Sequence, residues 1–109
     1  MIRFRVYQSD SRIQKFVVTG HSGYGEAGTD IVCAGVSALV YNAVNSCEQL
    51  LGIVLDATDT ENELRCVVQS SHRSNPDVQL LLHSLVFGVE QMAKAYPQYV
   101  KVERRTGTE

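Results

Sequence analysis

A histidine and a cysteine on either side of a glycine-rich segment are the residues of this chain best suited to covalent chemistry. The segment reads Gly20-His21-Ser22-Gly23-Tyr24-Gly25-Glu26-Ala27-Gly28-Thr29-Asp30-Ile31-Val32-Cys33. An imidazole beside a thiol removes its proton, and the resulting thiolate attacks a carbonyl carbon. The flexible segment between the two side chains allows them to meet. The pattern therefore predicts nucleophilic catalysis, with Cys33 as the nucleophile and His21 as the general base.

The place of Cys33 at the start of a predicted helix supports this interpretation. If Thr29 or Asp30 caps the helix, Cys33 lies in the first turn, where free backbone N–H groups and the positive helix end stabilise a thiolate. The same N–H groups, including that of Cys33, are candidate donors to an oxyanion. Asp30 and Ser37 are nearby polar residues able to orient the histidine or the substrate. Ser37 lies one helical turn beyond Cys33.

The three cysteines have different predicted environments. A cysteine in an apolar helix is most often a small core residue. Val32 and Val36 already occupy the core-facing phase, however, and Cys33 is turned roughly 100° away from Val32. Cys47 and Cys66 fall on the apolar stripes of their elements, and we expect them to be buried. The chain has three cysteines in all, an odd number, and they are widely spaced. A disulfide framework is therefore not expected, and a reducing compartment is favoured.

A nucleotide-binding site and a metal site fit the sequence less well than the thiol chemistry does. The pattern Gly23-x-Gly25-x-x-Gly28 matches a dinucleotide-binding fingerprint, which leaves a nucleotide-binding module as a lesser alternative. The strand before it belongs to a hairpin, whereas the fingerprint needs a parallel strand–helix–strand unit. The chain contains no Cys-x-x-Cys and no closely spaced histidine pair, so we expect neither a metal nor a cofactor.

The elements that must position these residues follow the order hairpin, helix, hairpin, helix, strand. Hydrophobic periodicity and capping signals predict strands over Ile2–Gln8 and Ile13–Thr19, a helix from Asp30 to Leu51 ended by Gly52, strands over Ile53–Ala57 and Glu63–Gln69, a helix from Asn75-Pro76-Asp77 to Ala95, and a strand over Tyr99–Arg105. This order predicts an α/β fold with two helices packed on a largely antiparallel sheet of about five strands.

Both predicted helices carry an apolar stripe. The core faces are predicted to be Val32, Val36, Leu39, Ala43, Cys47 and Leu50 in the first helix, and Val78, Leu81, Leu82, Leu85, Val89 and Met92 in the second. The first helix is apolar around more of its circumference than one packing face requires. We therefore expect a homodimer that buries the excess, unless other parts of the chain cover it.

Bulk composition limits the class of protein. The chain has 109 residues, of which 44% are apolar, and this fits one domain over residues 1–109. Ten basic residues against twelve acidic ones argue against direct nucleic-acid binding. No apolar run reaches the roughly 18 residues of a membrane span, so no membrane partner is expected. The N-terminal residues alternate as a strand does, which argues against a signal peptide and favours a cytoplasmic protein.

The segments Gly20-His21-Ser22 and Gly28-Thr29-Asp30-Ile31-Val32-Cys33-Ala34-Gly35-Val36-Ser37, joined by the glycine-rich loop, resemble the ribosomal-processing cysteine protease family, Prp. The resemblance places His21 and Cys33 on the catalytic dyad of that family. It makes Gly20, Ser22, Gly23, Gly28, Asp30 and Ser37 the supporting or substrate-binding positions. Ser22 departs from the family pattern, in which we expect alanine more often.

The resemblance implies a cytoplasmic, homodimeric cysteine endopeptidase without a cofactor. Its implied substrate is the N-terminal extension of ribosomal protein twenty-seven of the large subunit, which is removed during ribosome maturation. The main alternative is a non-enzymatic, ribosome-associated protein that binds the same ribosomal protein. Such a protein would keep its function after loss of either Cys33 or His21.

Overall fold

Strands β1 (Ile2–Ser9) and β2 (Arg12–Thr19) form the N-terminal hairpin of the computed structural model, which describes residues 1–26 and 28–107. Alternate β1 side chains enter the core, as the period of two in a half-buried strand requires. Asp10 and Ser11 form the turn with φ of 52° and 67°. Positive φ at both positions matches the twist of a two-residue hairpin. The predicted hairpin is confirmed, with each strand one residue longer.

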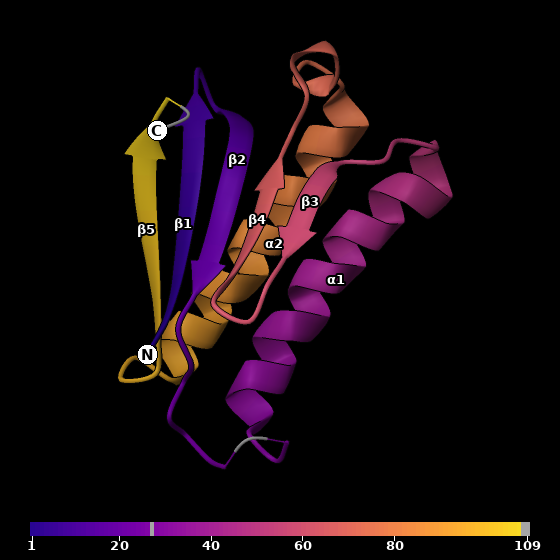
Figure 1. Ribbon diagram of the computed structural model, residues 1–109. Coiled ribbons are helices and arrows are strands. Elements are labelled where there is room, and N and C mark those ends of the chain that lie inside the picture. Colours follow the sequence, from indigo (N-terminus) through magenta and orange to yellow (C-terminus); the bar gives the residue numbers. More distant parts are fainter. Residues whose placement is uncertain (27, 108–109) are drawn as a thin grey trace.

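Three further strands complete one five-stranded sheet, β3 (Asp56–Asp59), β4 (Glu63–Val67) and β5 (Val100–Thr106). Their order across the sheet is β3-β4-β2-β1-β5 (Figure 1). Every neighbouring pair is antiparallel except β1 and β5, which run parallel. The predicted fold, two helices on a largely antiparallel five-stranded sheet, is confirmed.

The predicted boundaries of the second hairpin, Ile53–Ala57 and Glu63–Gln69, are wrong at both outer ends, and β3 also continues two residues beyond Ala57. Gly52 ends the helix in a left-handed conformation, and the N–H of Ile53 donates to the carbonyl of Cys47 at 3.0 Å. The residues after Gly52 therefore complete the end of the helix and connect it to the sheet. Pairing between strands β3 and β4 begins only at Asp56. A short 3₁₀ helix, Ser70–His72, lies between β4 and the second long helix.

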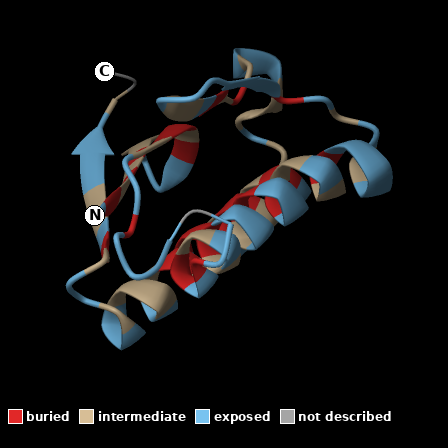
Figure 2. Cartoon of the chain, turned by 60° about the horizontal axis from the view of Figure 1, so that its bottom comes forward, coloured by how far each residue is buried: buried red, intermediate tan, exposed pale blue. Residues whose placement is uncertain are grey.

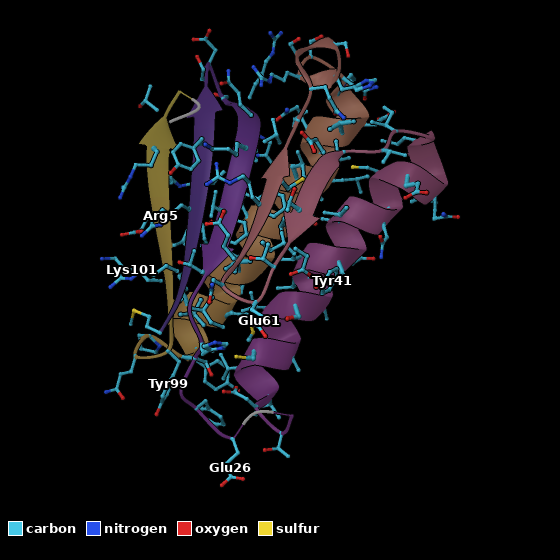
Figure 3. All side chains as sticks on the ribbon, viewed as in Figure 1. Arg5, Glu26, Tyr41, Glu61, Tyr99 and Lys101 are labelled. Atoms are coloured by element: carbon cyan, nitrogen blue, oxygen red, sulfur yellow. The ribbon has the colours of Figure 1, made fainter. Side chains whose placement is uncertain are left out.

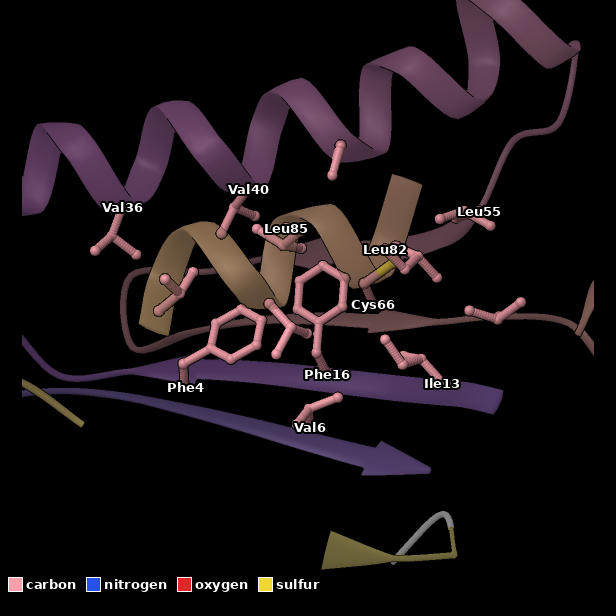
Figure 4. Close-up of a cluster of buried hydrophobic side chains, with 14 of the residues drawn as sticks. Phe4, Val6, Ile13, Phe16, Val36, Val40, Leu55, Cys66, Leu82 and Leu85 are labelled. Atoms are coloured by element: carbon pink, nitrogen blue, oxygen red, sulfur yellow. The ribbon is translucent and has the colours of Figure 1, made fainter. Parts of the chain in front are cut away.

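Helices α1 (Ile31–Leu51) and α2 (Pro76–Ala95) cover one face of the sheet. Figure 4 shows the core between them and the strands. Its largest fully buried side chains come from every layer and are Phe4, Val6, Ile13, Phe16, Val32, Cys47, Cys66, Val68, Val78, Leu82, Val89 and Val100. Asn75 caps α2 by accepting from the N–H groups of Asp77 and Val78, as its position before Pro76 predicted.

The core stripe of α1 differs from the prediction at its C-terminal end. Leu50 is 73% exposed, and the buried stripe ends at Cys47; in the middle of the helix Val40, at 2% exposed, also belongs to it. The helices pack closely at two glycines. A Cβ on Gly35 would lie 2.8 Å from the Met92 methyl, and one on Gly88 would lie 3.0 Å from a Leu39 methyl. α2 thus covers part of the apolar circumference that the sequence showed on α1.

The outer side of α1 remains exposed along most of its length (Figure 2). By length and composition alone this helix could cross a membrane. The core helix of a soluble protein passes the same test, and a buried stripe of α1 forms part of the core here. The apolar character of α1 is therefore explained in part by packing within the chain.

Candidate active site

The loop between β2 and α1 begins with a glycine that no other residue can replace without strain. Gly20 has φ of +82°, and a Cβ there would collide with the carbonyl oxygen of Met1. The loop leaves the sheet beside the N-terminus of the chain and returns at the start of α1 (Figure 1). His21 follows directly and is exposed. Close packing at Gly20 thus sets where the histidine leaves the sheet.

Asp30 caps α1 and ties the loop to it. Its Oδ1 accepts from the N–H groups of Val32 at 2.9 Å and Cys33 at 3.0 Å. Its Oδ2 accepts from the Ser22 hydroxyl and from the N–H of Gly25 at 3.2 Å. The Ser22 hydroxyl, followed by the Cys33 N–H, lowers the pKa of this carboxyl from 3.8 to about 2. Of the two residues predicted as possible helix caps, Asp30 caps the helix and Thr29 does not.

Ser22 is buried, with 3% of its surface exposed. Its hydroxyl donates to Asp30 and accepts from the N–H of Tyr24 at 3.0 Å. Its own N–H donates to the sulfur of Cys33 at 3.4 Å. The Tyr24 ring meets the rings of Tyr96 and Tyr99 edge-on, with centroids 5.5 and 5.2 Å away. The loop is therefore held both to α1 and to the segment between α2 and β5.

Cys33 lies at the edge of the core and is half-buried. Its position confirms that it is turned away from the fully buried stripe of Val32 and Val36. Cys47 and Cys66 are fully buried, as predicted. Burial raises the pKa of the Cys47 thiol and raises that of Cys66 to about 12. Cys33 is thus the cysteine with access to a substrate.

Two cavities meet at the predicted catalytic residues. The first, of about 230 Å³, lies between α1 and the β3–β4 hairpin, and the second measures about 480 Å³. His21, Cys33 and Ser37 line both. Among the described residues, the hydrogen bond to the Cys33 sulfur comes from Ser22 and not from the His21 imidazole. The imidazole and the thiol thus border the same two cavities without a hydrogen bond between them.

The far wall of the first cavity was missed by sequence reasoning. It consists of the tip of the β3–β4 hairpin, residues 59–64, together with Tyr41 of α1. The Tyr41 hydroxyl donates to Asp59, whose carboxylate raises the pKa of the tyrosine. Figure 3 shows Tyr41 on α1 and Glu61 at the hairpin tip. The spacing of four from Cys33 through Ser37 to Tyr41 could have revealed Tyr41, but nothing local places the hairpin tip there.

Several expectations for this segment need correction. The Cys33 N–H is already bonded to Asp30, so in this conformation it is not a free donor for an oxyanion. Among the described residues the Asp30 carboxylate bonds to Ser22, Gly25, Val32 and Cys33 and not to His21, so it caps the helix and does not orient the imidazole.

Of the predicted supporting glycines, Gly28 lines the second cavity, and Gly23 has positive φ but lies outside both cavity linings. Ala27 lies outside the described residues. The dinucleotide fingerprint has the wrong context, because β2 pairs antiparallel with both of its neighbours. Within the described residues there is no cluster of three or more His, Cys, Asp or Glu side chains able to hold a metal ion.

Comparison with known proteins agrees with this chemistry. The sequence profile of a family described as "Cysteine protease Prp" matches residues 1–101. A Bacillus subtilis protein named ribosomal processing cysteine protease Prp is 31% identical over 94% of this chain and 96% of its own length. A Staphylococcus aureus protein of the same name is 26% identical over 85% of this chain and 88% of its own length.

Solved structures show the same fold. A Streptococcus mutans protein superposes with a TM-score of 0.88 at 29% identity, over 98% of this chain and 99% of that one. The S. aureus ribosomal processing protease Prp, solved with a covalently linked product peptide, superposes with a TM-score of 0.86 at 22% identity, over 96% of this chain and all of that one. At that identity the second likeness shows the fold alone.

Proposed function

Because this chain belongs to the cysteine protease Prp family, we propose that it cleaves a ribosomal protein with Cys33 as nucleophile and His21 as general base. The observation that carries the assignment is the convergence of His21, Cys33 and Ser37 on the same two cavities at the start of α1. Burial removes Cys47 and Cys66 as alternatives. The other two histidines, His72 and His83, line neither cavity.

The reaction follows from these positions. His21 takes the thiol proton, and the thiolate of Cys33 attacks the scissile carbonyl carbon to form a tetrahedral intermediate. Collapse of the intermediate expels the amine, which His21 protonates, and leaves a thioester on Cys33. Water, deprotonated by His21, then hydrolyses the thioester and restores the thiol. The Ser37 hydroxyl, one turn from Cys33 and lining both cavities, supports the bound peptide.

The substrate we propose is the N-terminal extension of ribosomal protein twenty-seven of the large subunit. The relatives from B. subtilis and S. aureus are named for ribosomal processing, and a structure of the S. aureus enzyme holds a substrate peptide. In this chain the first cavity has apolar walls contributed by Ile2, Val18 and Val36. Such walls suit an apolar side chain next to the cleaved bond.

A peptide that spans the junction of extension and mature protein tests the proposal. We expect Cys33→Ala and His21→Ala to lower kcat/KM by roughly a thousandfold or more, with melting temperatures near that of the wild type. Ser37→Ala should give an intermediate loss. His72→Ala is the matched control and should cleave normally. Near-wild-type turnover by either dyad variant would end the assignment and would favour a binding protein without catalytic activity.

We also propose a cytoplasmic location, since the substrate is a ribosomal protein and free thiols persist in a reducing compartment. Cell fractionation checks this point. Recovery of the protein outside the cytoplasmic fraction would contradict it.

A further inference from the structure

We infer that Ser22 is a positioning residue, which aims its backbone N–H at the Cys33 sulfur and so stabilises the attacking thiolate. The inference rests on the proposed role of Cys33 as nucleophile. It concerns a position at which this chain carries a hydroxyl. That hydroxyl gives Ser22 a contact that a residue without a polar side chain cannot make.

Ser22 takes part in three hydrogen bonds close to the start of α1. The hydroxyl donates to the Asp30 carboxylate and accepts from the Tyr24 N–H at 3.0 Å, while the Ser22 N–H donates to the Cys33 sulfur at 3.4 Å. The side chain and the backbone of one residue thus contact the cap and the nucleophile together. Ser22 is 3% exposed, although its neighbours His21 and Gly23 are exposed.

The side chain of Ser22 adds a contact to those that the loop backbone already makes. Gly20, with φ of 82°, is packed against the Met1 carbonyl, whereas a Cβ on Gly23, with φ of 74°, would meet nothing within 4 Å. The hydroxyl bond to Asp30 ties Ser22, between these two glycines, to the start of α1. Because His21 is the adjacent residue, the same bond also limits where the imidazole can lie.

Two of the N–H groups at the helix start, which the sequence suggested as partners of the thiolate, are already bonded. The N–H groups of Val32 and Cys33 both donate to Asp30, whose negative charge already compensates the positive end of α1. The Ser22 N–H is directed at the sulfur, and the hydroxyl that places it also satisfies part of the Asp30 charge. Among the described residues, the Ser22 N–H is therefore the hydrogen-bond donor that lies at the Cys33 sulfur.

The test is the pH dependence of Cys33 alkylation by iodoacetamide, quantified by peptide mass, in the wild type, Ser22→Ala and Ser22→Thr. Ser22→Ala should move the midpoint of the rate profile upward by roughly half to one pH unit. At about pH 7 the rate of alkylation should fall by about threefold to tenfold. The acidic limb of kcat/KM should move in the same direction. Ser22→Thr keeps the donor and should retain the wild-type midpoint.

The matched control is Thr29→Val, which removes an exposed loop hydroxyl bonded to the carbonyl of Glu26 at 3.1 Å. It should leave the alkylation midpoint unchanged. A hydroxyl with only a structural role would lower the melting temperature of Ser22→Ala and leave both pH profiles in place. That result, or a midpoint moved by Ser22→Thr and not by Ser22→Ala, would overturn the inference.

Different results would reject the role of Ser22 and the role of Cys33 as nucleophile. If Cys33→Ala abolishes cleavage and Ser22→Ala leaves both pH profiles unchanged, Cys33 remains the nucleophile and the role of Ser22 is rejected. If Cys33→Ala retains full cleavage, the proposed nucleophile is rejected whatever Ser22 does. The alkylation profile of Cys33 reports on the Ser22 contact in either case.

Discussion

The three cysteines of this chain differ in how accessible their thiols are, because they lie in different surroundings. Cys33 is half-buried beside two cavities and receives an N–H at its sulfur. Cys66 is enclosed by the core, where burial raises its thiol pKa to about 12 and nearby Cys47 and Asp56 add to the effect. A thiol that stays protonated and has no access to solvent cannot act as a nucleophile.

This contrast predicts selective alkylation. In the native protein, iodoacetamide should modify Cys33 first, and Cys47 and Cys66 should react only after unfolding, because both are fully buried. Peptide mapping by mass spectrometry after brief exposure checks the order. The same reaction in guanidinium chloride should label all three cysteines and serves as the control. Early labelling of Cys47 or Cys66 would contradict the burial described here.

The charge of Asp30 predicts an acid-dependent loss of stability. Its pKa is lowered from 3.8 to about 2 in the folded state, chiefly by the Ser22 hydroxyl. A lowered folded-state pKa means that the ionised group stabilises the fold above the unfolded-state value, and that this contribution disappears as the pH falls through the folded value. Asp30→Asn keeps a capping oxygen and removes the charge.

Denaturant unfolding of the wild type and Asp30→Asn at several pH values measures this contribution. The wild type should be the more stable protein above the ordinary pKa of 3.8, and the difference should shrink as the pH falls toward about 2. Taking the difference between the two proteins removes the effect of the other carboxylates. A difference that does not change with pH would show that the Asp30 charge plays no part.

At the scale of elements, the loop between β2 and α1 depends on where each glycine lies. Gly20 and Gly28 both have positive φ, at 82° and 88°. Around Gly28 a Cβ would meet nothing within 4 Å, whereas at Gly20 it would strike the Met1 carbonyl beside the first strand. The left-handed backbone is common to both positions, and only Gly20 has a steric requirement as well.

Alanine substitutions separate the two effects. Gly28→Ala should destabilise the protein by about 1 kcal/mol, which is the strain of a left-handed alanine. Gly20→Ala adds overpacking against backbone and should cost about 1–3 kcal/mol more. Because Gly20 precedes His21, its replacement should also reduce peptide cleavage. Urea unfolding measures the two stabilities, and equal losses would show that the contact with Met1 is unimportant.

At the scale of the whole molecule, part of the apolar surface of α1 is accounted for within the chain. Leu39 packs against Gly88 of α2, and Val44 packs against the core. An exposed apolar stripe remains along the outer side of the helix. It consists of Ile31, Ala34 and Ala38, of which Ile31 is 58% exposed.

We predict that this stripe is the contact of a two-fold homodimer, since surplus apolar surface on a small domain is commonly buried against a second copy. Sedimentation at micromolar concentration should give about twice the 12.1 kDa mass of the chain. Ala38→Glu should give monomers, because it places a charge in the stripe. Phe87→Ser, which alters an exposed apolar residue of α2, is the control and should leave the dimer intact. A wild-type monomer with full activity would rule the dimer out.

What the sequence determined by itself was carried by short-range patterns. Cys33 near a capped helix start, Gly52 at the helix end and Asn75 before Pro76 each depend on residues within about one helical turn. The same holds for the alternation of β1 and for the burial of Cys47 and Cys66. Such signals are local because hydrogen bonds at caps and the periods of helices and strands join residues close in the chain.

Only the tertiary structure decided how these parts meet. The parallel pairing of β1 with β5, the β3–β4 tip beside Cys33 and the exposure of Leu50 depend on contacts between segments far apart in the sequence. The loop gives the clearest example. Its residues predicted a thiolate stabilised by the helix start, yet Asp30 takes those N–H groups and Ser22 contacts the sulfur instead. Which donor meets which acceptor is settled by the folded path of the loop, because glycine-rich backbone allows many paths and only packing selects one.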